Sequence, residues 1–482
     1  MANLKMRHFY LDLFSGAGGT SLGLEKAGFH SVGAVEKDQR ASETYHLNFG
    51  PPLLPCLNRA GIDIKRLDPK VLKRELSSVG IPRLDLLVAT PPCQGFSSIG
   101  RGKLKSLRKG KCYSGDARNS LYNYFLNFVD VLKPNAILFE NVPGMLNMKG
   151  INVVEVICEE LQELGYTVRA TLLNSSWYGV PQSRERVFII GYRNDLSIEP
   201  KFPAIKYDTK SIGGHWGQGK HFGCEWKSPE IFIREDKLPK SNLCKKAVSV
   251  KEALADLPSF KFHLKELKEG LKYRSYRDCF QPRSYKKPTP ANRYCKLMRQ
   301  WEGFPSSFVT DHFCRWTPRD FETFRQMRAG DKYPRAVEIA NELWRRAKIE
   351  AKRKSQKPPA KWEYVPPYSI TGFPEKWRKL YPQKLAWTLT AHLEKDSYSH
   401  IHFDSKQARS ITVREAARLQ SFPDGFHFSG SSGDVLRQIG NAVPPLMAYE
   451  IGLAIRRQLD RNIKVSSRDG YAKGERAVEV SI

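Results

Sequence analysis

The chain has 482 residues, of which 40% are hydrophobic and 11% aromatic, a composition that suits a folded protein of two or three domains. No apolar run approaches the ~18 residues of a membrane-spanning helix, and no secretory signal is recognisable at the start, so we expect a cytoplasmic protein without membrane contact. Lysine and arginine number 79 against 50 acidic residues, and the resulting net charge of +29 favours a polyanionic partner.

Residues 1–195 alternate short apolar runs with amphipathic stretches, which is the pattern of a parallel sheet covered by helices. Strands are predicted at residues 9–14, 32–35, 84–89, 136–139 and 187–190, and helices at residues 20–28 and 153–164. A glycine-rich loop follows the first of these strands. The first part of the chain is therefore predicted to be an α/β domain.

Polar groups follow the carboxyl ends of several predicted strands. The glycine loop follows the first strand, Glu36 the second, Cys93 the third and Glu140 the fourth. In open α/β sheets, ligands bind at this edge. We therefore expect these groups to share one site.

The alternation is lost between residues 194 and 410. Residues 201–400 contain 42 basic and 22 acidic residues and eight of the nine tryptophans. Basic side chains among aromatic ones suit contacts with phosphates and bases. The alternative is a basic surface that only aids solubility, and the concentration of charge in this stretch weakens it. One charged helix is predicted at residues 333–354, with an exposed loop at residues 352–359.

Helical order is predicted to return near the carboxyl end. Thr412 and Glu415 have the spacing of a capping box, which predicts a helix through Leu419. A final helix is predicted at residues 441–459. The polar residues from about Arg461 onward are expected to be frayed.

The glycine loop suggests a bound cofactor. Its glycines let the backbone approach a ligand closely, and Glu36 follows Gly18 by 18 positions, a spacing that suits hydrogen bonds to ribose hydroxyls. The loop alone does not separate a nicotinamide cofactor from S-adenosylmethionine. Position 21 is Ser, so the full Gly-x-Gly-x-x-Gly spacing of dinucleotide enzymes is absent.

Cys93 is a candidate nucleophile. It follows Pro91 and Pro92, which stiffen the exit from the strand, and it precedes Gly95, which permits a turn. A buried structural cysteine is the alternative, because free cysteines are commonly buried. The nine cysteines contain no Cys-x-x-Cys pair, which favours reduced thiols and no metal site.

Two arginines precede the last predicted strand. Arg184 and Arg186 are two positions apart, so on an extended chain both point to the same side. They could complete a site with Glu140 or simply form part of a solvated surface.

Together these segments resemble, in order and over nearly the whole chain, the DNA (cytosine-5) methyltransferase family of the bacterial restriction-modification type. The similarity lies in residues 12–19, 91–94, 140–142, 182–186, 414–423 and 438–445. It implies a Rossmann-like S-adenosylmethionine-dependent methyltransferase domain and a second, smaller and irregular target-recognition domain. The corresponding boundaries are residues 1–195 for the cofactor-binding and catalytic domain, 196–425 for the recognition domain with its supporting helix, and 426–482 for a segment that returns to the catalytic domain.

The resemblance also implies roles for individual residues. Cys93 would add to carbon 6 of a flipped-out cytosine, Glu140 would act at ring nitrogen 3, and Arg186 with Arg184 would bind the base carbonyl. S-adenosyl-L-methionine would be the cofactor, without a metal. The residues implied to contact it are Phe14, Ser15, Gly16, Gly18, Gly19, Glu36, Asp63, Ile64, Pro91, Asn441 and Val443. Residues 98–115, rich in glycine and basic side chains, suit a mobile loop that closes over the base.

The expected partner is double-stranded DNA, with a cognate restriction endonuclease as a functional counterpart and the chain itself a monomer. Three alternatives remain open at this point. They are an RNA cytosine-5 methyltransferase that acts on transfer RNA, a catalytically silent DNA-binding relative, and a nicotinamide-dependent oxidoreductase.

Overall fold

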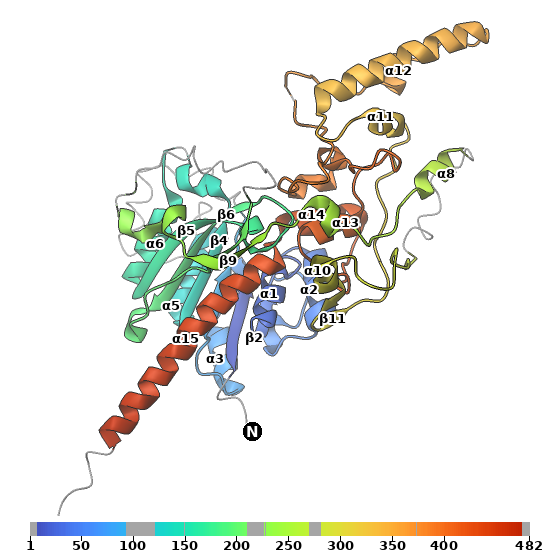
Figure 1. Ribbon diagram of the computed structural model, residues 1–482. Coiled ribbons are helices and arrows are strands. Elements are labelled where there is room, and N and C mark those ends of the chain that lie inside the picture. Colours follow the sequence, from blue (N-terminus) through green and yellow to red (C-terminus); the bar gives the residue numbers. More distant parts are fainter. Residues whose placement is uncertain are drawn as a thin grey trace, which may run out of the picture.

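The computed structural model describes residues 7–92, 121–148, 150–209, 226, 228–268, 281–372 and 374–474. A helix-covered sheet forms one part of the molecule, and an irregular region with few strands rises beside it (Figure 1). Cys93 and residues 98–115, for which the sequence predicts a nucleophile and a mobile loop, lie outside the described residues.

The main sheet has seven strands in the order β2-β1-β3-β4-β6-β5-β8. The strands are β1 (His8–Leu13), β2 (Phe29–Val35), β3 (Leu86–Ala89), β4 (Ala136–Asn141), β5 (Tyr166–Asn174), β6 (Glu185–Arg193) and β8 (Phe232–Ile233). Strands β2, β1, β3 and β4 are parallel neighbours. The predicted α/β sheet is confirmed, and the carboxyl ends of these four strands meet at one edge.

Helices cover both faces of this sheet. On one face lie α3 (Pro69–Ser78), α5 (Leu121–Leu132) and α6 (Val153–Glu163), packed against Leu11, Leu87 and Ile137. On the other face lie α1 (Gly19–Lys26) and α15 (Pro445–Gly474), packed against neighbouring strand residues such as Leu86 and Leu138. Because both faces are buried, the strands are continuously apolar, which is why they are visible in the sequence.

Strand β6 departs from the predicted parallel sheet. It pairs antiparallel with β4 on one side and with β5 on the other. Strand β5 itself is not among the predicted strands, because its residues 166–174 mix polar and apolar side chains. The short connection between β5 and β6, which includes η6 (Ser175–Tyr178), permits an antiparallel pair.

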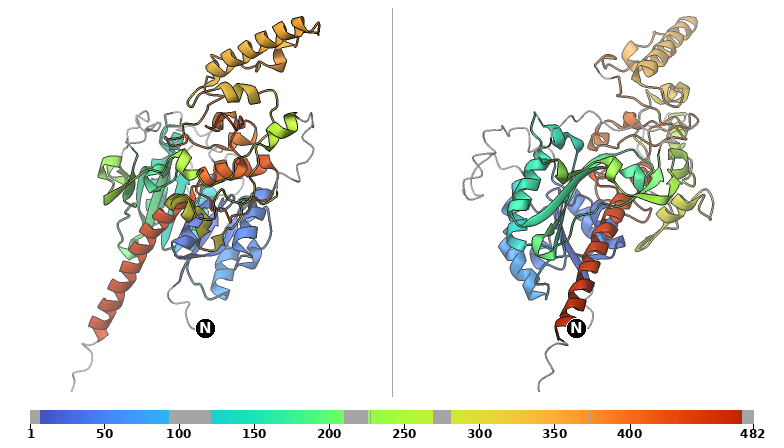
Figure 2. Two further views of the ribbon diagram at one scale, coloured as in Figure 1. Left: turned by 45° about the vertical axis from the view of Figure 1, so that its right-hand side comes forward. Right: turned by 60° about the vertical axis from the view of Figure 1, so that its left-hand side comes forward.

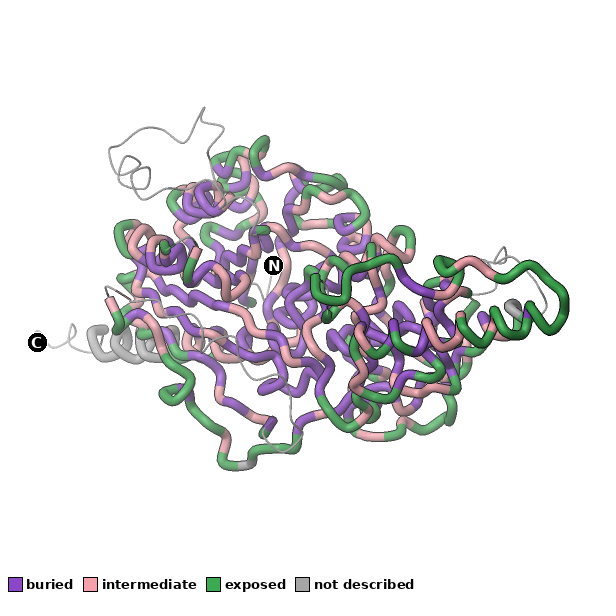
Figure 3. The backbone as a smooth tube through the Cα atoms, turned by 90° about the horizontal axis from the view of Figure 1, so that it is seen from above, coloured by how far each residue is buried: buried purple, intermediate pink, exposed green. Residues whose placement is uncertain are grey.

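The irregular region contains short elements and one long helix. The short elements are β7 (Ile205–Asp208), β9 (Lys240–Lys246), α7 (Val250–Ala253), α8 (Phe262–Lys268), α10 (Arg293–Arg299), β10 (Gln300–Trp301), β11 (Phe304–Pro305) and α11 (Phe321–Gln326). The long helix is α12 (Tyr333–Arg353), where the charge pattern predicts one, and it projects from the body of the molecule in three views (Figures 1 and 2). Seen from above, much of its length is exposed, whereas the sheet is buried (Figure 3).

Two large apolar cores lie among the described residues of this region. An outer core joins α11 and the start of α12 to Trp377 and Ile401. An inner core joins Trp301 and α13 (Val413–Leu419) to Leu22 of α1 and Leu446 of α15. The inner core is therefore shared with the sheet domain and fixes the irregular region on it.

The carboxyl-terminal segment returns to the sheet domain. The capping box between Thr412 and Glu415 is present at the start of α13, as predicted. The prediction of one helix over residues 441–459 is wrong at its start, because Asn441 ends α14 (Ser432–Asn441) and α15 begins at Pro445. Helix α15 continues past Arg461 to Gly474, and the fraying expected from about Arg461 stays a prediction.

Within the described ranges, no helix is long and apolar enough to cross a membrane. The remaining turns of helix are short and of 3-10 type. They comprise η2 (Pro55–Leu57), η3 (Ile64–Arg66), η5 (Pro143–Asn147), η7 (Asn194–Leu196), η10 (Pro229–Ile231), η11 (Glu235–Lys237), η12 (Lys361–Glu363), η13 (Ala391–Glu394) and η14 (Ser397–His400).

Candidate active site

A pocket of about 770 Å³ lies at the carboxyl edge of the parallel strands, and we call it the reaction pocket. Ligand sites in proteins commonly enclose about 300–1,000 Å³. Predicted site residues that line it are Phe14, Ser15, Gly16, Glu36, Asp63, Ile64, Pro91, Glu140, Arg184, Arg186, Asn441 and Val443. The fold thus brings together groups that are more than 400 positions apart in the sequence.

The loop after β1 is held in a tight turn. Phe14 and Gly16 both have positive φ, at 62° and 55°. The Phe14 and Ser15 amides donate to the carbonyl oxygen of Val35, at 2.7 and 3.3 Å. The Thr90 hydroxyl donates to the Phe14 carbonyl oxygen at 2.8 Å. These bonds fix the loop against β2 and β3, so that its backbone forms one wall of the pocket.

Glu36 connects the glycine loop with the start of the next helix. Its carboxylate accepts hydrogen bonds from the amides of Gly16 at 2.9 Å and Asp38 at 2.6 Å. Burial raises the pKa of this carboxyl, and the hydrogen bonds oppose that rise. Each carboxylate oxygen has a second lone pair, so Glu36 can accept further hydrogen bonds from hydroxyl groups of a ligand.

Gly18 and Gly19 serve packing and do not line the pocket. Gly18 has a φ of 90°, and a Cβ there would overlap the Phe49 ring. A Cβ on Gly19 would lie 2.5 Å from the Val443 carbonyl oxygen. These glycines allow α1 to approach α2 (Gln39–Phe49) and the segment after α14, and the contact with the cofactor predicted for them stays a prediction.

Asp63 and Ile64 also line the pocket. Asp63 pairs with Lys37 at 3.0 Å and accepts the Lys65 amide at 3.1 Å. Ile64 is buried in the sheet's core and still lines the pocket. Asp63 and Ile64 offer a carboxylate and an apolar surface next to Glu36.

The exits of β3 and β4 lie together. The Asn141 side-chain amide donates to the Pro91 carbonyl oxygen at 2.8 Å, and Pro91 is buried. This bond fixes the backbone of Pro91, just beyond the end of β3, beside Glu140. Pro92 and then Cys93 follow in the sequence. Glu140 and Asn141 are the last residues of β4, where the sequence predicts them just beyond the strand.

Glu140 and Arg186 form an ion pair inside the pocket. Glu140 Oε1 lies 3.1 Å from Arg186 Nε, and both side chains are about nine-tenths buried. Burial raises the pKa of Glu140, while Arg186 and Arg184 act in the opposite direction. A buried carboxyl of this kind can hold a proton or share one with a bound base.

Arg184 has a different environment from Arg186. Its side chain is 1% exposed and donates to the carbonyl oxygens of Leu389 at 2.6 Å and Gly440 at 3.0 Å. The neighbouring Gln182 accepts the Leu389 amide at 2.8 Å and bonds with the Gln420 side chain. Each terminal nitrogen of Arg184 is therefore bound to a backbone carbonyl, whereas its buried Nε has no partner among the described residues. Through these two bonds Arg184 joins β6 to the segment around Leu389 and to α14.

The pocket is closed on its last side by residues from the carboxyl-terminal segment. Asn441 and Val443 line it together with Ala442. The Gln420 amide donates to the Ala442 carbonyl oxygen at 2.6 Å. This bond ties the turn between α14 and α15 to the end of α13.

A sequence profile of C-5 cytosine-specific DNA methylases matches residues 9–457. The chain belongs to this family. The enzyme is a DNA (cytosine-5)-methyltransferase, and its family and fold imply S-adenosyl-L-methionine as the methyl donor and DNA as the substrate. The pocket suits such a cofactor, because it combines the glycine loop, the acceptor Glu36 and the apolar side chain of Ile64.

The methyltransferase is similar to several curated relatives. It is 36% identical over 464 residues to the putative type II methyltransferase M.OihORF3336P of Oceanobacillus iheyensis, covering 93% of this chain and 95% of that protein. It is 31% identical to the type II methyltransferase M.DdeI of Desulfomicrobium norvegicum, covering 92% and 86% of the two chains. The fold is shared with a crystal structure described as a putative DNA modification methyltransferase encoded within a prophage of E. coli. That comparison has a TM-score of 0.59 and 23% identity and covers 94% of this chain and 99% of the other.

Several pocket residues of the methyltransferase are absent from the sequence prediction. Those from the sheet domain are Val35, Lys37, Asp38, Ala41, Ile62 and Thr90, and those from the irregular region and α14 include Thr390, Ala391, His392, Glu394 and Arg437. Asp38 follows the same strand end as Glu36, so the rule that identified Glu36 could have found it. The residues of η13 have no comparable local signal, because only the tertiary fold brings them to the pocket.

Arg437 is the most connected of these additional residues. Its guanidinium pairs with Asp38 at 2.9 Å, Glu394 at 3.0 Å and Asp434 at 3.1 Å. It therefore bridges the amino end of α2, η13 and α14 at the pocket rim. Within the part of the chain that is described, no group of three or more His, Cys, Asp or Glu residues could hold a metal ion.

Proposed function

We propose that this methyltransferase modifies carbon 5 of a flipped-out cytosine in a specific duplex DNA sequence through a covalent bond between Cys93 and carbon 6. The observation that carries the proposal is the buried Glu140–Arg186 pair, 3.1 Å apart, in the pocket that also holds the glycine loop and Glu36. The fixed position of Pro91 beside the end of β4 supports the proposal, because Cys93 follows Pro91 by only two positions in the sequence.

The chain's side chains would prepare the base for methylation. The Cys93 thiolate would form a bond to carbon 6, and the ring electrons would shift toward nitrogen 3, where the proton of Glu140 is taken up. Arg186 would donate to the base carbonyl and stabilise the charge that develops there. Carbon 5 then carries enamine character, which the unmodified ring lacks.

The product would be released by reversing the addition. When bound, the cofactor would supply an electrophilic methyl group. After carbon 5 gains the methyl group, it loses its proton to a base, and the bond between Cys93 and carbon 6 breaks. Glu140 recovers its proton from nitrogen 3 in the same step, so the enzyme returns to its starting state.

Four parts of the pocket would hold the cofactor. The backbone of residues 14–16 faces it, Glu36 would accept ribose hydroxyls, Asp63 with Ile64 would contact the adenine, and Asn441 with Val443 would close the pocket. We assign Arg184 a positioning role, because its guanidinium binds the Leu389 and Gly440 carbonyls. This differs from direct contact with the base carbonyl, which the family resemblance implies for it together with Arg186.

The target base would have to leave the duplex. A cytosine inside stacked DNA cannot reach a pocket formed at a sheet edge, and extrusion costs a few kcal/mol. The irregular region between residues 196 and 425 would recognise the surrounding sequence. Because the relatives include type II methyltransferases, we further propose that the modification protects host DNA against a cognate restriction endonuclease.

The test is methyl transfer from tritiated S-adenosylmethionine to mixed-sequence duplex DNA. We expect label in 5-methylcytosine with the wild type and with Cys244→Ala, a matched change at an exposed cysteine. Cys93→Ala should give no product, and Glu140→Gln should lower kcat by about 10²- to 10⁴-fold, the range for loss of a general acid.

Two further substrates separate the alternatives. A duplex with fluorine at carbon 5 should trap the Cys93 adduct, because fluorine cannot leave as a cation. Label entering transfer RNA but not DNA would replace the proposal with an RNA methyltransferase. Transfer to DNA by Cys93→Ala at the wild-type rate would contradict the covalent mechanism.

A further inference from the structure

A second hollow, distinct from the reaction pocket, lies in the recognition region. It has a volume of about 570 Å³ and is lined by Lys261, Leu264, Lys265, Lys268, Arg325, Ser405 and Lys406. None of these residues lines the reaction pocket. Five of the seven are basic, and no carboxylate is among the described residues that line it. We call it the basic hollow.

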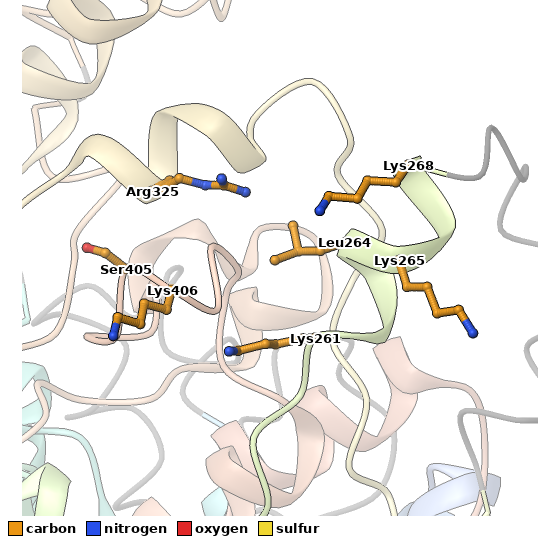
Figure 4. Close-up of a pocket in the computed structure, with 7 residues that line it drawn as sticks. All are labelled: Lys261, Leu264, Lys265, Lys268, Arg325, Ser405 and Lys406. Atoms are coloured by element: carbon orange, nitrogen blue, oxygen red, sulfur yellow. The ribbon is translucent and has the colours of Figure 1, made fainter.

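The basic side chains come from three separate elements. Lys268 on α8 and Arg325 on α11 extend toward each other across the hollow, and Lys261 and Lys406 lie below them (Figure 4). Lys265 points away in the same view. The concentration of charge therefore results from the tertiary fold, since these residues are up to 145 positions apart in the sequence.

The wall of the basic hollow is held by a buried lysine. Lys379 is fully buried, and its Nζ donates to the carbonyl oxygens of Phe324 at 2.7 Å and Met327 at 2.8 Å. It also donates to the Ser405 hydroxyl at 2.8 Å. This ammonium joins the end of α11 to the turn that carries Lys406, so Arg325 and Lys406 project from one fixed surface.

Two carboxylates adjoin lining residues: Asp404 precedes Ser405 in the chain, and Glu322 pairs with Arg325. Asp404 accepts the Lys406 amide at 3.0 Å and the Gln407 side chain at 3.1 Å. Glu322 pairs with Arg325 at 3.3 Å, but both side chains are about half exposed, and such pairs contribute little. The basic hollow therefore keeps a strong excess of positive charge.

The chemistry of the basic hollow suits phosphate groups of a polymer. No aromatic side chain is among its described lining residues, so it has no surface on which a base could stack. Lysine contacts phosphates as a point charge and carries no base preference. Building on the proposed function, we propose that the basic hollow binds backbone phosphates of the substrate duplex and adds affinity that is independent of sequence.

The test compares two variants that each lose three positive charges. One is Lys261→Ala, Lys268→Ala and Lys406→Ala in the basic hollow. The control is Lys70→Ala, Lys73→Ala and Arg74→Ala, all exposed on α3 of the sheet domain. Binding to a duplex without cytosine and to a target-containing duplex is measured from low to physiological salt, together with cofactor binding and thermal unfolding.

We expect the basic-hollow variant to bind both duplexes about 10- to 100-fold more weakly at low salt. The slope of log affinity against log salt should fall by about 2 to 3, because each lost phosphate contact contributes about 0.9. The control should keep the wild-type slope. Replacement of the same three lysines by arginine should restore binding, and kcat at saturating DNA should not change.

Equal affinities and slopes for the two variants would overturn the inference. So would an unchanged DNA affinity combined with lost binding of inorganic phosphate or single-stranded RNA, which would assign the basic hollow to another anion. The binding measurement does not require methyl transfer. A wild-type protein that fails to methylate DNA would therefore contradict the proposed function and leave the inference about the basic hollow to be decided by the binding data.

Discussion

At the scale of single residues, one short motif contains two arginines with different surroundings. Arg186 reaches Glu140 in the reaction pocket, whereas Arg184 is buried and bonds to two backbone carbonyls. Burial lowers the pKa of both guanidinium groups, and Glu140 opposes that effect. The sequence predicts that the two side chains point to the same side of the chain. Only their partners in the structure distinguish an arginine that can act on a substrate from one that holds the backbone in place.

We predict that substitutions at the two arginines have different effects. Arg184→Met should lower the free energy of unfolding by about 2–4 kcal/mol, because the Leu389 and Gly440 carbonyls lose their donors in a buried place. Arg186→Met should leave stability closer to the wild type and lower kcat by at least about 100-fold. Urea unfolding and single-turnover kinetics measure the two quantities. Equal losses of stability in both variants would contradict this division.

At the scale of elements, the seven-residue helix α13 is buried along its whole length and carries three charged side chains. Arg409 forms two bonds of 2.7 and 2.8 Å with Glu415, and Arg418 pairs with Asp424 and Asp256. Removal of one partner from a buried pair leaves the other charge without compensation, which is more costly than removal of both.

Arg409→Met should therefore destabilise the protein by about 3–5 kcal/mol. The double variant Arg409→Met with Glu415→Leu should recover a large part of that loss, although Leu cannot replace the capping bond to Thr412. Thermal and urea unfolding of the wild type, both single variants and the double variant give the coupling. Purely additive effects would show that the pair does not act as a unit.

Strand β1 carries a buried carboxyl beneath the glycine loop. The Ser21 hydroxyl of α1 donates to Asp12 Oδ2 at 2.6 Å, and Oδ1 has no partner among the described residues. Burial raises the pKa of Asp12 to about 7, from an ordinary value of 3.8. The folded state therefore holds this proton more tightly than the unfolded state, and Asp12 lowers stability as the pH rises from about 4 to 7.

Asp12→Asn should remove this dependence. Relative to the wild type, its free energy of unfolding should increase by up to about 1.4 kcal/mol per pH unit between pH 4 and 7, and the difference should be constant above pH 8. Urea unfolding at a series of pH values measures the slope, and Asp130→Asn, at an exposed site on α5, is the control. Parallel profiles for the wild type and Asp12→Asn would refute the prediction.

At the scale of the whole molecule, the carboxyl-terminal helix completes the sheet domain. Helix α15 packs against α1, and small residues permit the close approach. A Cβ on Gly23 would lie 2.5 Å from the Pro445 carbonyl oxygen and the Tyr449 amide. The same contact region supports Gly19 and Val443, so helix packing and the cofactor side of the reaction pocket are linked.

Gly23→Ala should separate α1 from α15. We expect a loss of about 1–3 kcal/mol in stability, typical of overpacking, and weaker binding of S-adenosylmethionine. Gly372→Ala, where a Cβ would have ordinary contacts at 3.4 Å, should change stability by less than about 0.5 kcal/mol. Calorimetric titration with the cofactor and urea unfolding measure both effects. If the Gly23→Ala variant is destabilised but binds the cofactor with unchanged affinity, the packing of α1 on α15 does not influence the reaction pocket.

Structural features that depend on residues close together in the chain can be predicted from the sequence. Continuous apolar runs identify β1 to β4, because each strand is buried on both faces, and the Thr412–Glu415 pair identifies the start of α13. Glu36 and Glu140 can be recognised as candidate site residues because each is a polar residue at the carboxyl end of a buried strand. For these residues, short-range periodicity and turn chemistry suffice.

Other features required the tertiary structure. The insertion of β6 between β4 and β5, the backbone partners of Arg184, and the approach of η13 and Arg437 to the reaction pocket all depend on segments far apart in the chain. Such contacts leave no local pattern, because they are decided by which apolar faces pack together once the elements exist. The sequence alone determined the buried strands β1 to β4, the start of α13 and the chemical groups at the strand ends. The packing of the elements against one another decided how those groups face each other.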